Sequence, residues 1–207
     1  SGTGPTGGRL LRPSDGQEAK KIAWFQCVGS RDIHHGDNAY CSSICCMYAL
    51  KEAMMAKELC PEPPETSIFF MDIRTFGKDF ELYLNRAQNL GVRLIRSRIH
   101  SIDPIANNNI SLKYIDETGE SQVEDYELVV LSVGMQITKE TQDLAKKLGI
   151  ELNEHNFAKT STFQPVKTNR PGIYVCGAFQ NPLNIPESVT QASAAVAAVS
   201  ADLNTAR

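Results

Sequence analysis

The sequence lacks an excess of charge of one sign. Its 21 Lys and Arg residues stand against 24 Asp and Glu residues, which gives a formal net charge of −3. A chain without a basic field has little electrostatic attraction for phosphates, so we expect no nucleic-acid partner. With 42% hydrophobic residues in 207, the composition instead predicts one ordinary globular domain or two small ones.

Long hydrophobic runs are also missing. The longest uncharged stretch near the C-terminus covers residues 188–201, and it is too short and too rich in Ala and Ser to cross a bilayer, which takes about 20 apolar residues. The first eight residues, SGTGPTGG, lack the apolar segment of a signal peptide. These absences favour a cytoplasmic protein without direct membrane insertion.

Two sequence features of redox enzymes are missing, namely a dinucleotide-binding turn between a strand and a helix and a Cys-x-x-Cys pair. No Gly-x-Gly-x-x-Gly sequence stands between a predicted strand and a predicted helix, so we expect no complete site for a nicotinamide or flavin dinucleotide. No Cys-x-x-Cys pair occurs either. Thiol–disulfide exchange of the thioredoxin reductase type is therefore not expected.

The placement of cysteine is the most specific feature that is present. Five of the six cysteines lie between residues 27 and 60. A secreted disulfide scaffold is disfavoured, because the chain is long enough to build a core and shows no secretory signal. Four of these cysteines form a Cys-x13-Cys-x3-Cys-Cys pattern, namely Cys27, Cys41, Cys45 and Cys46. In a reducing compartment this pattern indicates thiolate ligands for a metal or an iron–sulfur cluster. Zinc is less favoured, because four-cysteine zinc sites usually combine two short spacings and only one is present.

The spacing of these cysteines also constrains the local structure. Cys41 and Cys45 would share a helix face if the helix began at Cys41, whereas Cys46 would point about 100° away from Cys45. Adjacent cysteines cannot both be ligands on a regular helix. We therefore predict an irregular helix start, where backbone N–H groups and the helix dipole would stabilise thiolates.

Hydrophobic periodicity predicts alternating strands and helices. The expected strands are residues 21–27, 67–74, 92–95, 110–115, 126–133 and 172–176, and the expected helices are residues 42–59, 78–90, 139–148 and 186–203. The alternation in the first half predicts βαβ units and a parallel sheet. Residues 110–133 predict antiparallel strands, and Cys176 is expected to be a buried packing residue in an apolar strand.

Four segments carry a family resemblance. Residues 25–32 (FQCVGSRD) and 40–49 (YCSSICCMYA) resemble the flavoprotein A-subunit of heterodisulfide reductase and its relatives in anaerobes. Residues 169–178 (NRPGIYVCGA) and 187–192 (ESVTQA) resemble the closing FAD segment of thioredoxin-reductase-like flavoproteins. The cysteine motif is specific to the A-subunit group, while the closing motif is shared by many unrelated activities.

The resemblance implies an α/β fold with a Rossmann-like doubly wound parallel sheet and an antiparallel hairpin, as part of a flavoprotein with two dinucleotide-binding domains. Residues 1–17 would be a linker, and residues 18–133 would form an inserted NAD(P)-domain-like unit that carries the cysteine motif. Residues 134–207 would be the C-terminal return segment of the FAD domain. Because the first FAD segment is absent, the chain resembles a piece of a longer oxidoreductase, and we expect it to be inactive alone.

The resemblance also implies cofactors and partners. In the A-subunit group, four cysteines in this arrangement hold a [4Fe–4S] cluster near the flavin, and they correspond here to Cys27, Cys41, Cys45 and Cys46. The FAD of the full-length protein, not bound by this piece alone, would contact Gly177, Ala178, Glu187, Ser188 and Val189. The implied function is electron transfer between FAD and the cluster during reduction of a CoM-S-S-CoB-type disulfide. Other heterodisulfide-reductase-like subunits and electron carriers are the expected partners, with self-association into a homodimer as a further expectation. The alternative is a non-catalytic docking domain of the redox complex that binds no cluster.

Overall fold

The computed structural model describes residues 4–33 and 38–205. The chain divides into two compact units. The first contains the residues up to Val28 together with Cys45–Val133, and the second contains Gly29–Ile44 and Gly134–Arg207. One boundary between the units therefore falls between residues 133 and 134, and residues 29–44 belong to the second unit.

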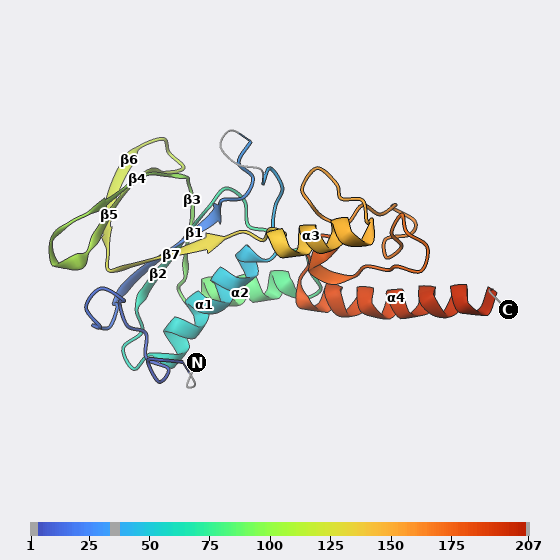
Figure 1. The fold of residues 1–207 in the computed structure, drawn as a ribbon. Helices are drawn as coiled ribbons and strands as arrows, with labels where there is room; N and C mark the ends of the chain where they lie inside the picture. The colour runs from blue at the N-terminus through green and yellow to red at the C-terminus, as the bar shows by residue number, and fades with distance from the viewer. Residues whose placement is uncertain (1–3, 34–37, 206–207) are drawn as a thin grey trace. The chain divides into compact units, whose positions relative to one another are not determined.

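The first unit is built on a four-stranded parallel sheet with the strand order β3-β2-β1-β7 (Figure 1). Its strands are β1 (Lys21–Val28), β2 (Glu65–Phe70), β3 (Arg93–Arg96) and β7 (Leu128–Val133). Helix α1 (Cys45–Leu59) connects β1 to β2, and α2 (Phe80–Asn89) connects β2 to β3. The predicted βαβ units and parallel sheet are confirmed, because parallel strands require such crossover connections.

Both faces of this sheet are covered, and the central strand β1 has a continuous buried run over residues 22–25 rather than an alternating pattern. On one face, α1 packs Leu50 and Met54 into a core with Trp24 and Ile68. The other face is covered by a three-stranded antiparallel sheet. Tyr126 of this sheet packs in a hydrophobic core that also contains side chains of β1 and β2. Its strands are β4 (Ile99–Pro104), β5 (Ile110–Ile115) and β6 (Ser121–Tyr126).

Several predicted boundaries in the first unit differ from the structure, and two of the differences have a clear physical reason. The segment predicted as one strand over 126–133 belongs to two elements, because β6 pairs with β5 and then β7 returns to pair with β1. Helix α1 begins at Cys45, three residues later than predicted. Ser43 has a φ of 63°, and this left-handed conformation is incompatible with a regular right-handed helix.

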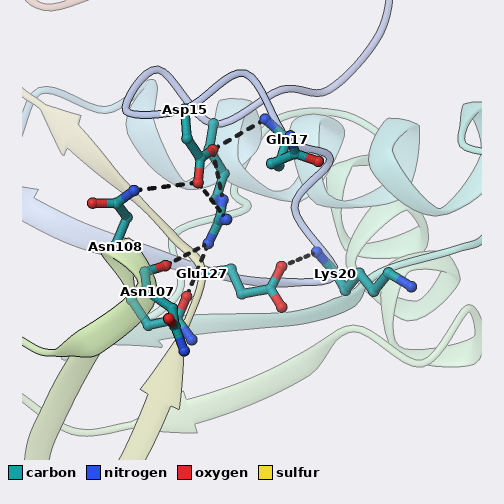
Figure 2. A network of polar contacts seen from close by, with 8 residues as sticks. Asp15, Gln17, Lys20, Asn107, Asn108 and Glu127 are labelled. Atoms are coloured by element: carbon teal, nitrogen blue, oxygen red, sulfur yellow. Dashed lines mark hydrogen bonds and ion pairs between the residues drawn. The ribbon is translucent and has the colours of Figure 1, made fainter.

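Part of the segment predicted as a linker, residues 1–17, is attached to the first unit. Asp15 pairs with Arg12 at 2.6 Å and accepts a hydrogen bond of 3.3 Å from Asn108, in the short helix η1 (Ala106–Asn108) (Figure 2). Leu10 packs against the core under α1. These contacts make the segment an arm of the first unit, a role that its Gly and Pro content does not reveal.

The second unit contains less regular structure. Its elements are α3 (Lys139–Leu148), the short helix η2 (Gly177–Phe179) and α4 (Ile185–Thr205). Helix α3 matches its predicted range, because Thr138 caps its first turn and Gly149 ends it in the left-handed conformation with a φ of 68°. The predicted strand over 172–176 is wrong, since Tyr174 forms only an isolated bridge with Lys167.

Helix α4 has 21 residues, and none of them is buried. Within the described ranges, no helix is both long and apolar enough to pass through a lipid bilayer.

A polar network lies where the two sheets of the first unit meet. Glu124 accepts two hydrogen bonds of 2.9 Å from the guanidinium of Arg93 and one of 2.5 Å from the hydroxyl of Tyr114. The Arg93 hydrogen bond holds the pKa of Glu124 well below its usual range. Burial, followed by the hydrogen bond to Glu124, raises the pKa of Tyr114 to about 12.

We predict that core packing under α1 dominates the stability of the first unit. Leu50 is fully buried, with 0% of its surface exposed, whereas Leu59 at the end of the same helix is 67% exposed. Leu50→Ala should lower the unfolding free energy by about 2–5 kcal/mol, because it leaves a cavity. The matched variant Leu59→Ala should change it by less than about 1 kcal/mol. Urea unfolding measures both, and equal losses would contradict this assignment of the core.

We also predict a pH dependence that originates at Glu124. Because its pKa is lower in the folded chain, the unfolded chain binds protons more readily as the pH falls. The stabilisation is complete well above the pKa of an unfolded Glu, about 4.3, and is lost progressively as the pH falls from there towards the lower pKa of folded Glu124. Thermal unfolding between about pH 6 and pH 3 should show a smaller loss of stability for Glu124→Gln than for the unaltered chain. Glu117 lies in an exposed turn, so Glu117→Gln should lose as much stability at low pH as the unaltered chain. If Glu124→Gln also lost as much stability as the unaltered chain, the prediction would be contradicted.

Candidate functional site

The order of strands in the first unit reverses between β1 and β7. From β1 the chain moves through α1 and α2 to β2 and β3 on one side, and it later returns to the other side of β1 as β7. In open α/β sheets, ligands bind outside the carboxyl ends of the strands at such a switch point. The carboxyl ends that flank it are Val28 and Val133.

Three of the four motif cysteines lie near this edge of the sheet. Cys27 is the penultimate residue of β1 and has a φ of 63°, at an irregularity in the pairing with β7. Cys45 is the first residue of α1, and its Sγ donates to the backbone oxygen of Val133 over 3.6 Å. Cys46 is buried, and its Sγ lies 3.9 Å from the backbone oxygen of Asp72, just after β2.

Cys41 belongs to the second unit, in the segment that precedes α1. Its Sγ accepts a hydrogen bond of 3.3 Å from the backbone N–H of Ser43. The backbone is irregular just before the helix, where Ser43 is left-handed, but Cys45 and Cys46 are both residues of α1, so neither is presented by an irregular helix start as the sequence predicts. Cys41 therefore precedes the helix and does not share a helical face with Cys45.

The six cysteines are thiols that differ in exposure. Cys46 is buried, and Cys176 is exposed. The remaining four are partly buried, namely Cys27, Cys41, Cys45 and Cys60. The prediction of a buried Cys176 is wrong, because residues 172–176 do not form a strand within a sheet that could cover it.

The geometry bears on the kind of metal group that these thiols could hold. Among the residues that the structure describes, no three His, Cys, Asp or Glu side chains come close enough together to hold a metal ion. A structural zinc site requires four ligands around one ion at about 2.0–2.3 Å, so the described residues do not form one. A four-iron cluster binds each cysteine through a different iron, and its ligands need not converge on one point.

The residues expected to contact FAD lie in η2 and the first turns of α4. Gly177 has a φ of 69°, and its N–H donates to the side-chain oxygen of Gln191 in α4 at 2.9 Å. A Cβ at Gly177 would lie 3.7 Å from Ser188, which is ordinary contact, so the backbone conformation rather than space requires glycine. Gly177 and Ala178 are the first two residues of the short helix η2.

The start of α4 is capped by its own side chains. Glu187 accepts a hydrogen bond from the N–H of Asn184 and donates its own N–H to the Asn184 side chain, both at 2.8 Å. This reciprocal arrangement is a capping box. The hydroxyl of Ser188 donates to the backbone oxygen of Asn184 at 2.8 Å, and Val189 is 62% exposed. The predicted flavin residues are thus brought together, with Glu187 engaged as a cap.

One group of residues at the site has no signal in the sequence. Tyr40 and Ser42, which flank Cys41, both bind the backbone of Met135. The partners are 93 and 95 positions apart in the chain, so no local motif connects them.

Comparison with known proteins identifies the class to which this fold belongs. Residues 65–198 match the profile of the family described as pyridine nucleotide-disulphide oxidoreductase. The match covers more than half of the chain, and the chain belongs to this oxidoreductase family.

Two curated relatives define the similarity more narrowly. Both are A-subunits of heterodisulfide reductases. The second iron-sulfur A-subunit of the CoB--CoM heterodisulfide reductase of Methanopyrus kandleri is 44% identical over 201 residues, which cover 94% of this chain and 30% of the relative. The A-subunit of the H(2)/formate:CoB-CoM heterodisulfide,ferredoxin reductase of Methanococcus maripaludis is 44% identical over 202 residues. These residues cover 95% of this chain and 30% of the relative. The chain thus spans about 30% of the length of these relatives, and the resemblance to the A-subunit group is confirmed.

A solved structure, thioredoxin reductase from Streptococcus pyogenes MGAS5005, aligns with 17% identity over 96% of this chain and 55% of its own, with a TM-score of 0.42.

The exposures predict an order of thiol reactivity in the cluster-free chain. Alkylating reagents need access to sulfur, so Cys176 should react fastest and Cys46, which is 7% exposed, slowest, with rates at least about tenfold apart. Timed iodoacetamide labelling under anaerobic conditions, followed by peptide mass spectrometry, measures each site. Equal rates at Cys46 and Cys176 would contradict the described burial.

Proposed function

We propose that this chain is the electron-transfer module of an iron–sulfur flavoprotein that resembles the A-subunit of heterodisulfide reductase. In this proposal Cys27, Cys41, Cys45 and Cys46 hold a [4Fe–4S] cluster. The observation that carries it is the position of Cys27 and Cys45 at the switch point of the parallel sheet, where doubly wound folds bind their ligands.

The chemistry of the donors supports the proposal. Thiolates are the soft ligands that iron–sulfur clusters use, and all four positions are thiols. Cys45 is the first residue of a 15-residue helix, whose first backbone N–H groups have no partner within the helix and whose dipole favours negative charge. Thiolates and a negatively charged cluster would both be stabilised there.

A cluster would take the place that a dinucleotide occupies in related folds. The loop after β1 has the sequence Cys27-Val-Gly-Ser-Arg-Asp32, and its single glycine cannot fill the three glycine roles of a dinucleotide fingerprint. This supports a cluster rather than NAD(P) in the first unit.

The flavin would belong to the longer protein. Gly177 and Ala178 would allow close approach of the backbone to FAD, and the first turn of α4 would direct its N–H groups towards it, with Glu187, Ser188 and Val189 as contacts. When bound, FAD exchanges electrons in pairs or singly, and a [4Fe–4S] cluster carries one at a time. The role of this chain is to hold and orient both groups.

The whole protein would reduce a CoM-S-S-CoB-type heterodisulfide. This reaction breaks one S–S bond, takes up two electrons and two protons, and releases two thiols. One relative carries ferredoxin in its name, and both are named as subunits. We therefore infer that other heterodisulfide-reductase-like subunits and electron carriers are the partners, in a cytoplasmic setting that keeps thiols reduced.

Iron analysis tests the proposal. After anaerobic reconstitution, the chain should contain about four iron and four acid-labile sulfide atoms and show an EPR signal on reduction with dithionite. Cys45→Ala should lose most of the iron, because it removes a ligand. Cys60→Ala, which removes a cysteine outside the motif, should retain all of it.

An iron-free chain after reconstitution would favour the alternative of a docking domain without a cluster. The same iron content in Cys45→Ala and the unaltered chain would show that the iron is bound elsewhere, and would also contradict the proposal.

A further inference from the structure

Cys41 lies between two residues, Tyr40 and Ser42, whose side chains both form hydrogen bonds with the backbone of Met135. The hydroxyl of Tyr40 donates to the backbone oxygen of Met135 at 2.7 Å, and the backbone N–H of Met135 donates to the hydroxyl of Ser42 at 2.8 Å. The backbone oxygen and the backbone N–H of Met135 are thus both hydrogen-bonded to the neighbours of Cys41. We call Tyr40, Ser42 and Met135 the Cys41 bracket.

The Ser42 side of the bracket is deeply buried. Ser42 is 1% exposed and Ser30 is 5% exposed, and their hydroxyls lie 2.9 Å apart. A buried hydroxyl is costly unless it is hydrogen-bonded, and Ser42 satisfies this condition with Ser30 and Met135. A Cβ at position 134 would lie 2.0 Å from the Ser30 Oγ and 2.6 Å from the Ser42 Oγ, so Gly134 is required for space.

Tyr40 is held in place by an aromatic contact of its ring and by a hydrogen bond of its backbone. Its ring packs edge-on against the buried Phe157, with 5.2 Å between ring centroids. The backbone oxygen of Tyr40 accepts a hydrogen bond of 3.1 Å from the N–H of Arg31. The side chain of Asn38 donates to Gln136 at 3.0 Å, which adds a second tie to the segment after β7.

The bracket sets the environment of the Cys41 sulfur. Ser43 follows the bracket directly, and its left-handed conformation accompanies the hydrogen bond from its N–H to the Cys41 Sγ. Hydrogen bonds to cysteine sulfurs are among the factors that tune the potential of iron–sulfur clusters. Displacement of the bracket would alter both the position of this sulfur and its hydrogen bond.

We propose that Tyr40 and Ser42 are positioning residues, which fix the Cys41 sulfur as a cluster ligand by holding Met135 from both sides. This inference deepens the proposed function and rests on it. It assigns a role to two residues that coordinate nothing themselves, and to Gly134 as the position that admits the Ser30–Ser42 pair.

The test uses Tyr40→Phe and Ser42→Ala, each with a matched control from the same unit. Tyr174→Phe also removes a tyrosine hydroxyl that is hydrogen-bonded, to Asp202. Ser161→Ala also removes a serine hydroxyl that accepts a backbone N–H, from Gln164. Each chain is reconstituted anaerobically, and its iron content, EPR spectrum, reduction potential and rate of iron loss to a chelator are compared.

Both bracket variants should still assemble the cluster, because all four thiols remain. Their EPR spectrum and reduction potential should shift, and iron should be lost about three- to tenfold faster, as expected when one hydrogen bond is removed. The two controls should match the unaltered chain. Bracket variants identical to the controls in spectrum, potential and iron loss would overturn the positioning role while leaving the cluster intact.

A second readout does not require the cluster. In the iron-free chain, the bracket variants should increase iodoacetamide labelling of Cys41 several-fold over the controls, without a matching increase at Cys46. A general loss of structure would instead raise labelling at both sites. Unchanged labelling of Cys41 would overturn the inference even if the unaltered chain bound no iron, an outcome that separately contradicts the proposed function.

Discussion

The pairing of β1 with strands on both of its sides is the constraint on which the rest of the first unit depends. Trp24 lies beside Ile68 of β2 on one side and Val130 of β7 on the other. A strand buried on both faces must be apolar along its length, and residues 22–25 are all buried. Because β7 returns to the far side of β1, the strand order reverses there, and the carboxyl ends of these two strands define the edge at which Cys27 and Cys45 lie.

The four motif cysteines are held in place by different parts of the chain. Cys27, Cys45 and Cys46 are positioned by β1 and α1, whereas Cys41 is held within the second unit by side chains that bind the backbone after β7. The left-handed conformations of Cys27 and Ser43 interrupt regular structure at and beside the motif cysteines. Such conformations cost free energy and persist only where the surrounding structure holds them in place.

The sequence predicts correctly those helices and strands whose hydrophobic alternation or capping residues lie within or directly beside the element. Strand β5 and helix α3 match their predicted ranges, because alternation and capping residues are local. The prediction for Cys176 was wrong because residues 172–176 form only an isolated bridge between Tyr174 and Lys167, and this pairing leaves Cys176 exposed although Val175 beside it is buried. The contacts of Tyr40 and Ser42 with Met135 span more than 90 positions, so neither periodicity nor spacing could reveal them. The set of motif cysteines could be selected from the sequence, whereas their division between two units could not.

The central claim is that this chain binds a four-iron cluster rather than a single metal ion. Mössbauer spectroscopy of the chain reconstituted with ⁵⁷Fe tests it most directly, because the spectrum distinguishes iron that shares electrons within a cluster from isolated iron. We expect the delocalised, diamagnetic spectrum of an oxidised [4Fe–4S] centre to account for nearly all of the bound iron. A spectrum of isolated high-spin iron, or the absence of specifically bound iron, would contradict the account.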